Sequence, residues 1–190
     1  VLRDQGDLAQ ALTAFQDSLA IAQRLASADP SNAAWQRDVS VSHDNVGNVL
    51  RDQGDLAQAL TAFQDSLAIR QRLASADPSN AAWQRDLSVS HDNVGNVLRD
   101  QGDLAQALTA FQDSLAIAQR LASADPSNAA WQRDLSVSHN NVGKVLSDQG
   151  DLAQALTAFQ DSLAIAQRLA SADPSNAAWQ RDLSVSHNNV

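Results

Sequence analysis

The sequence from Val49 to Asn96 reads VLRDQGDLAQALTAFQDSLAIRQRLASADPSNAAWQRDLSVSHDNVGN, and this stretch decides the fold. The same string begins, with few changes, at Val1, Val97 and Val145, so the chain repeats itself every 48 residues. Self-similarity at such a period is typical of repeat architectures, in which each unit buries its apolar face against the next. We expect one repeat domain, a fragment of a longer array, with four units: residues 1–48, 49–96, 97–144 and 145–190, the last incomplete.

The first half of each unit predicts an amphipathic helix. Its large apolar residues in the first copy are spaced by four, three and four positions and so share one helical face: Leu8, Leu12, Phe15 and Leu19. Asp7 precedes this run in the N-cap position, and Gln10 stands where a capping box places its glutamine. We predict a helix over residues 8–27 and call this kind helix B.

The second half of each unit predicts another helix. Asp29 is expected to cap it, with Pro30 at the first helical position, where the missing N–H of proline costs nothing. A stripe with four-and-three spacing follows: Trp35, Val39, Ser42, Val46, Val49 and Gln53. We predict a helix over residues 30–52, called helix A. Gly6, and Gly54 in the next copy, suit the left-handed position that ends helix A.

These elements predict an all-α fold. Strand patterns are absent, and the short links between helices require antiparallel neighbours. A long coiled coil is excluded because glycine and Asp-Pro pairs stop every helix after about 20 residues, and because the apolar face of each helix is wider than a two-stranded seam. A face of that width suits a solenoid, in which each helix touches two neighbours.

A known signature also runs from the end of the first copy into the second. The residues of this stretch fit the small and apolar positions of the tetratricopeptide repeat motif at Val46, Gly47, Leu50, Gly54, Leu56, Ala59, Phe63 and Ser66. The proline that closes the 34-residue motif comes seven residues late, at Pro78, and the next small glycine, Gly95, comes seven late again. Seven residues are nearly two helical turns, so both helices can lengthen while their faces stay on the core.

The chain therefore resembles the tetratricopeptide family along its whole length, and in particular the long-helix arrays of kinesin light chains and of bacterial signalling proteins. This resemblance implies a right-handed superhelical solenoid of antiparallel helix pairs. It also implies a concave groove lined by helix A and a role in protein–protein interaction. Neither a cofactor nor an enzymatic activity is implied.

The face of helix A opposite its apolar stripe carries mixed charges, amides and one valine per repeat, which suits an extended peptide or a partner helix. Each asparagine amide offers a donor and an acceptor for a peptide backbone. The alternative is that each asparagine bonds a neighbouring helix of the array. The candidate groove residues are Arg37, Val41, Asp44, Asn45, Asn48, Arg51, Arg85, Val89, Asp92, Asn93, Asn96, Arg99, Arg133, Val137, Asn140, Asn141 and Lys144.

Two other residue types call for an interpretation. One histidine recurs in each repeat, at His43, His91, His139 and His187. Copies one helix pair apart are too distant for a shared metal shell, so these histidines are interpreted as structural and no metal site is predicted. Arg70 stands in the apolar arc of helix B, where the other copies have alanine, and we expect its stem to lie along the core with its guanidinium at the surface.

Composition limits the partners. The formal net charge of −9 disfavours nucleic acid and anionic membranes, and the chain has no cysteine. No transmembrane stretch or signal segment is visible, so a cytoplasmic location is expected. No phosphate loop, serine elbow or zinc-protease motif occurs, so no enzyme is expected.

The sequence thus predicts a scaffold that binds a peptide or a partner helix. One alternative is a self-assembling array that stacks head to tail through uncapped ends, since terminal repeats normally need a polar outer face. Another is a designed, consensus-like repeat protein without a natural ligand, because the four copies are so uniform.

Overall fold

The structure, a computed structural model, describes residues 7–190, and in this range it contains eight helices and no strand. The chain forms two compact units, Val1–Gly102 and Asp103–Val190, which are treated separately. Helices of the B kind are α1 (Leu8–Ala28), α3 (Leu56–Ala76), α5 (Leu104–Ala124) and α7 (Leu152–Ala172). Helices of the A kind are α2 (Ala33–Asp52), α4 (Ala81–Asp100), α6 (Ala129–Asp148) and α8 (Ala177–Asn189).

Helix B begins and ends almost where its sequence predicts. The backbone N–H of Gln10 donates to the Asp7 side chain at 3.1 Å, so the predicted N-cap is confirmed. In the next copy the side chain of Gln58 also donates to the carboxylate of Asp55, at 2.5 Å. The helix ends at Ala28, one residue beyond the predicted end, and the other B helices have the same length of 21 residues.

Helix A begins three residues later than predicted, and the predicted cap is wrong. Asn32, not Asp29, is the N-cap, and its side chain accepts from the backbone N–H groups of Ala34 and Trp35. The physical reason is that the Asp29 carboxylate is already used: it accepts from Ser31 N at 3.1 Å and from Ser31 Oγ at 2.6 Å. Asp-Pro-Ser therefore forms a turn, and the helix starts after it.

A glycine ends helix A, as predicted. Gly54 has a φ of +83°, its N–H donates to Arg51 O at 3.0 Å, and the N–H of Asp55 donates to Leu50 O at 2.9 Å. This pair of bonds is a Schellman motif, and it satisfies carbonyls at the helix end. Gly102 and Gly150 have the same backbone conformation, whereas Gly6 lies outside the described residues. Asp55 then caps the next helix, so one three-residue turn serves both helices.

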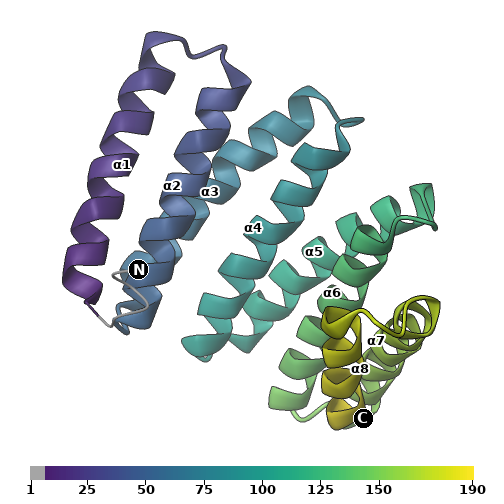
Figure 1. Cartoon of the computed structure of the whole chain (residues 1–190). Coiled ribbons are helices and arrows are strands. Elements are labelled where there is room, and N and C mark those ends of the chain that lie inside the picture. The colour runs from purple at the N-terminus through teal and green to yellow at the C-terminus, as the bar shows by residue number, and fades with distance from the viewer. Residues whose placement is uncertain (1–6) are drawn as a thin grey trace. The chain divides into compact units, whose positions relative to one another are not determined.

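Consecutive helices in each unit run antiparallel and pack side by side (Figure 1). In the first unit the ring of Phe63 on α3, 1% exposed, lies against Gly47 on α2, where an added Cβ would come within 2.9 Å of it. In the second unit Leu135 of α6 is buried among Ala118 and Ala122 of α5 and Ile165 of α7. The predicted all-α repeat fold of helix pairs is confirmed.

The lengthened ends of the helices are joined by a recurrent side-chain bond. Gln84 of α4 donates from Nε2 to the Ala74 carbonyl near the end of α3 at 3.1 Å, and Gln132 and Gln180 do the same to Ala122 and Ala170. Each bond satisfies a carbonyl in the last turn of a B helix. None of the helices in residues 7–190 combines the length and the apolar character needed to cross a membrane.

Candidate functional site

One valine on each A helix stays exposed on the face where the candidate groove residues were predicted. Val41, Val89 and Val137 are 37%, 41% and 40% exposed, and Val185 is 42% exposed. The core-facing valines of the same helices are buried, with Val49, Val97 and Val145 at 0%. The exposed valines therefore form a recurrent apolar spot on an otherwise polar face.

Three of the candidate arginines are held by the next A helix in their unit. Arg37 of α2 donates to Asp86 of α4 from Nε and Nη2, at 2.5 and 3.2 Å, and this pairing raises the pKa of Arg37. Arg51 pairs with Asp100 at 2.6 Å, and Arg133 of α6 pairs with Asp182 of α8. These arginine side chains are 47%, 37% and 45% exposed, so each pair contributes at most about 1 kcal/mol. The arginines are neutralised by aspartate partners.

The candidate asparagines are half-buried at the same face. In the second unit Asn189 Nδ2 donates to Asn140 Oδ1 at 3.3 Å, which is the helix-to-helix bond that the alternative interpretation predicts. Of the remaining candidates Arg85 is exposed, and the others are half-buried: Asn45, Asn48, Asp92, Asn93, Asn96, Arg99, Asn141 and Lys144.

The expectation that Arg70 reaches the surface is wrong. Arg70 is 5% exposed, and its guanidinium lies between α2 and α4. Nη2 pairs with Asp44 Oδ2 at 2.5 Å. The other bonds, each 3.1 Å long, go to Ser40 Oγ, Ser90 Oγ and the Asp86 carbonyl. Four acceptors line the site, so the charge is satisfied inside the core and gains nothing by reaching solvent.

Asp44, a candidate groove residue, turns its carboxylate toward Arg70. Its side chain is only 13% exposed. Burial raises the pKa of Asp44, and Arg70, Ser66 and Asn93 act in the opposite direction. Within the described residues, Asp44 Oδ1 and the buried Ser66 Oγ have no hydrogen-bond partner of normal geometry. Asp44 is thus a member of a buried polar cluster rather than an open groove residue.

Two of the recurrent histidines are partly buried beside a carboxylate. His43 Nδ1 lies 3.7 Å from Asp65, and His139 Nδ1 lies 3.8 Å from Asp161. Burial lowers the pKa of both histidines, although Asp65 and Asp161 act to raise it. Among residues 7–190, no group of three histidine or carboxylate side chains could hold a metal ion.

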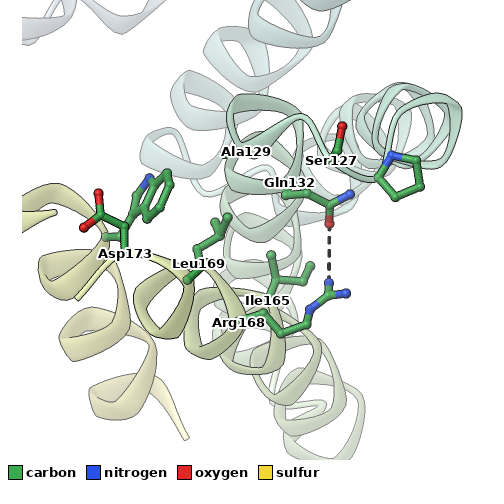
Figure 2. A pocket seen from close by; sticks show the side chains of 10 residues that line it. Ser127, Ala129, Gln132, Ile165, Arg168, Leu169 and Asp173 are labelled. Carbon is green, nitrogen blue, oxygen red and sulfur yellow. Dashed lines mark hydrogen bonds between the residues drawn. The ribbon is translucent and has the colours of Figure 1, made fainter. Parts of the chain in front are cut away.

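The second unit also contains a pocket that the sequence analysis missed. About 400 Å³ in volume, it lies between the start of α6, the end of α7 and Trp179 of α8. Figure 2 shows Ile165 and Leu169 on its wall and the bond from Arg168 to Gln132, 3.4 Å long, across it. Its wall comes from three helices of two repeats. The sequence signal for it is the late proline of the repeat, because that proline marks the lengthened helix ends beside which the pocket lies.

The profile of the tetratricopeptide repeat family matches four segments, residues 1–31, 42–79, 90–127 and 138–175. The chain belongs to this family. Repeats of this family build scaffolds for protein–protein interaction, and the chain is such a repeat scaffold. No curated protein matches it in sequence.

Solved structures are similar to the chain at low sequence identity, and the first of them shares its fold. BtubC (BKLC) from P. vanneervenii is 14% identical, with a TM-score of 0.64 over 96% of this chain and 71% of that one. MamA is 15% identical, with a TM-score of 0.49 over 98% of this chain and 81% of that one. The N-terminal domain of stress-induced protein-1 from C. elegans is 14% identical, with a TM-score of 0.48 over 80% of this chain and 97% of that one.

Proposed function

We propose that the face of helix A that carries the exposed valines binds an extended, largely uncharged peptide segment of a partner protein. The observation that supports this most is the set of valines at 37–42% exposure, one on each A helix. Exposing the apolar surface of a valine to water is unfavourable in free energy. An apolar side chain of a partner that covers the valine would remove this unfavourable exposure.

The paired arginines disfavour a strongly acidic peptide as the ligand. Arg37, Arg51 and Arg133 already have carboxylate partners, so a strongly acidic peptide would have to compete with Asp86, Asp100 and Asp182. The net charge of −9 also opposes an acidic ligand. The half-buried amides of Asn45 and Asn93 supply donors and acceptors to a peptide backbone of any sequence.

A charge substitution on the valine face tests the proposal. Peptides selected from a random library on the native chain are titrated against Val89→Asp and against Gln64→Asp, which places the same charge on the exposed side of α3. Val89→Asp is expected to weaken binding about tenfold or more, because it puts an uncompensated charge in the apolar contact. Gln64→Asp should leave the affinity unchanged. Equal affinities for all three proteins would contradict the proposed face.

A further inference from the structure

The four B helices are almost interchangeable in sequence. α1, α5 and α7 are identical, and α3 differs from them only at Arg70. A chain of this kind has several helix pairings of similar free energy, so its repeats are prone to mispair within one chain or between two copies. The residue at position 70 is therefore the one feature by which an A helix can distinguish α3 from the other B helices.

In the second unit, the buried serines at the corresponding interface bond to one another. Ser162 Oγ of α7 lies 2.8 Å from Ser136 Oγ of α6 and 3.5 Å from Ser186 Oγ of α8. The counterparts of Arg70 and Asp44 in this unit are Ala166 and Asn140, neither of which is charged. This interface is thus held by hydroxyl groups.

In the first unit, Arg70 replaces that bonding pattern with a charged one. The counterparts of the two outer serines are Ser40 and Ser90, and both of their Oγ atoms accept from Arg70 at 3.1 Å. Ser66, the counterpart of the central serine, has no hydrogen-bond partner of normal geometry among residues 7–190. Arg70 also pairs with Asp44 of α2. The two units therefore use the same serines in two patterns that exclude each other.

We propose that the Arg70–Asp44 pair selects the partner of α2, so that α2 packs on α3 and not on α5 or α7. Packing of α2 on α5 or α7 places Asp44 opposite an alanine, with its carboxylate buried and no cation beside it. Packing of α3 on α6 places Arg70 opposite Asn140, which leaves a buried guanidinium without a carboxylate. Both arrangements are strongly unfavourable, because each buries a charge without its counter-charge.

This selection is separate from stability. A buried ion pair adds little net stability compared with a neutral replacement, but it penalises a wrong partner. The neutral Ala166–Asn140 combination of the α6–α7 interface carries no such penalty. The same combination introduced between α2 and α3 should therefore keep the native pairing stable and allow α2 to accept the other B helices as well.

Cross-linking measures which B helix packs on α2. His43 of α2 lies 3.7 Å from Asp65 of α3, and Asp161 is the counterpart of Asp65 on α7. Because the chain has no cysteine, His43→Cys can be combined with Asp65→Cys to report the native pairing, or with Asp161→Cys to report pairing of α2 with α7. Each protein is refolded from urea and treated with a short bis-maleimide, and cross-linked monomers and dimers are separated by denaturing electrophoresis.

Three backgrounds are compared: the native residues, Arg70→Ala/Asp44→Asn, and that double variant with Ala166→Arg/Asn140→Asp added, which transfers the pair to α6 and α7. The double variant should raise the yield of the 43–161 cross-link about tenfold or more, because the mispaired charge is gone. The transferred pair should return this yield to the native level. The 43–65 cross-link should form in all three backgrounds. An unchanged 43–161 yield in the double variant, no decrease on transfer, or loss of the 43–65 cross-link in the double variant would overturn the proposal.

Discussion

Arg70 occupies a position at which the other three repeats have alanine, and its charge lies inside the first unit. The guanidinium has bonds to Asp44, Ser40, Ser90 and a backbone carbonyl, so its burial is compensated. Such pairs often add little net stability compared with an apolar replacement, but removing one member leaves an unpaired charge in the core.

The contribution of the Arg70–Asp44 pair to stability can be tested by replacing it with the uncharged residues that the second unit has at the corresponding positions. We predict that Arg70→Ala lowers the free energy of unfolding by about 3–5 kcal/mol, because it leaves the Asp44 carboxylate buried and unpaired. The double variant Arg70→Ala/Asp44→Asn recreates the Asn140–Ala166 combination of the second unit and should recover most of the loss. Urea titrations followed by circular dichroism measure both changes. A double variant as unstable as Arg70→Ala would show that charge pairing is not the cause.

The buried histidines predict a pH dependence. Burial lowers the pKa of His43 and His139 in the folded state, so below pH 6.5 the unfolded chain binds more protons than the folded chain. Stability should therefore fall as the pH is lowered from 6.5 toward the depressed pKa values. We expect His43→Gln and His139→Gln each to reduce this fall in urea titrations at pH 7.5 and 5.5. An equal fall in the native chain and in both variants would contradict this cause.

Some residue positions could be predicted from sequence and others could not. The Asp7 cap and the glycine turn depend on neighbours within a few residues, and the sequence contains those neighbours. The role of Arg70 depends on Asp44, which is 26 residues away on another helix. The residues near Arg70 in its own helix do not reveal this partner, and the sequence analysis therefore predicted that the guanidinium lies at the surface. A usable signal existed: the one copy with arginine lies between two A helices with aspartate, Asp44 and Asp92.

At the level of helices, Gly143 within α6 and Gly150 in the turn after it have different functions. An added Cβ at Gly143 of α6 would lie 2.6 Å from the Phe159 ring of α7, so this glycine permits close helix packing. Gly150 has a φ of +84° and no atom within 4 Å of an added Cβ, so it is needed for the backbone conformation of the turn.

These two functions predict different responses to alanine. Gly143→Ala should cost about 1–3 kcal/mol by overpacking, and Phe159→Leu in the same chain should relieve part of it. Gly150→Ala should cost about 1–2 kcal/mol through left-handed strain, and Phe159→Leu should not relieve it. Thermal and urea unfolding of the four variants measure these effects. Equal rescue of both glycine variants by Phe159→Leu would contradict the distinction.

Helix boundaries followed from the sequence except at the start of helix A. Asp29 and Asn32 are both good capping residues, and the sequence alone favoured Asp29 because proline follows it. Ser31 determines which of the two is the cap, because its N–H and its Oγ both donate hydrogen bonds to the Asp29 carboxylate. Asn32 is then the residue that caps the helix. The correct signal was therefore present as Asp-Pro-Ser-Asn, in which an aspartate turn precedes the capping asparagine.

At the scale of the molecule, repetition explains what could and could not be predicted. Nearest-neighbour packing of helix pairs followed from the 48-residue period, since within each unit the helices contact the ones next to them in sequence. The period could not show which residues on the exposed face of an A helix already form side-chain bonds to the next repeat. Within each unit, arginines reach aspartates 49 residues later, one repeat and one position further along the chain.

The central claim for function is that ligand contact is confined to the A helices. Since the chain has no cysteine, one cysteine introduced in place of Val89 on α4, or of Gln64 on α3, can carry an environment-sensitive dye without background labelling. The measurement is the change in dye emission when a selected peptide is added to each labelled protein. The account predicts a saturable change at position 89 and none at position 64. A change at position 64 with none at position 89 would contradict it.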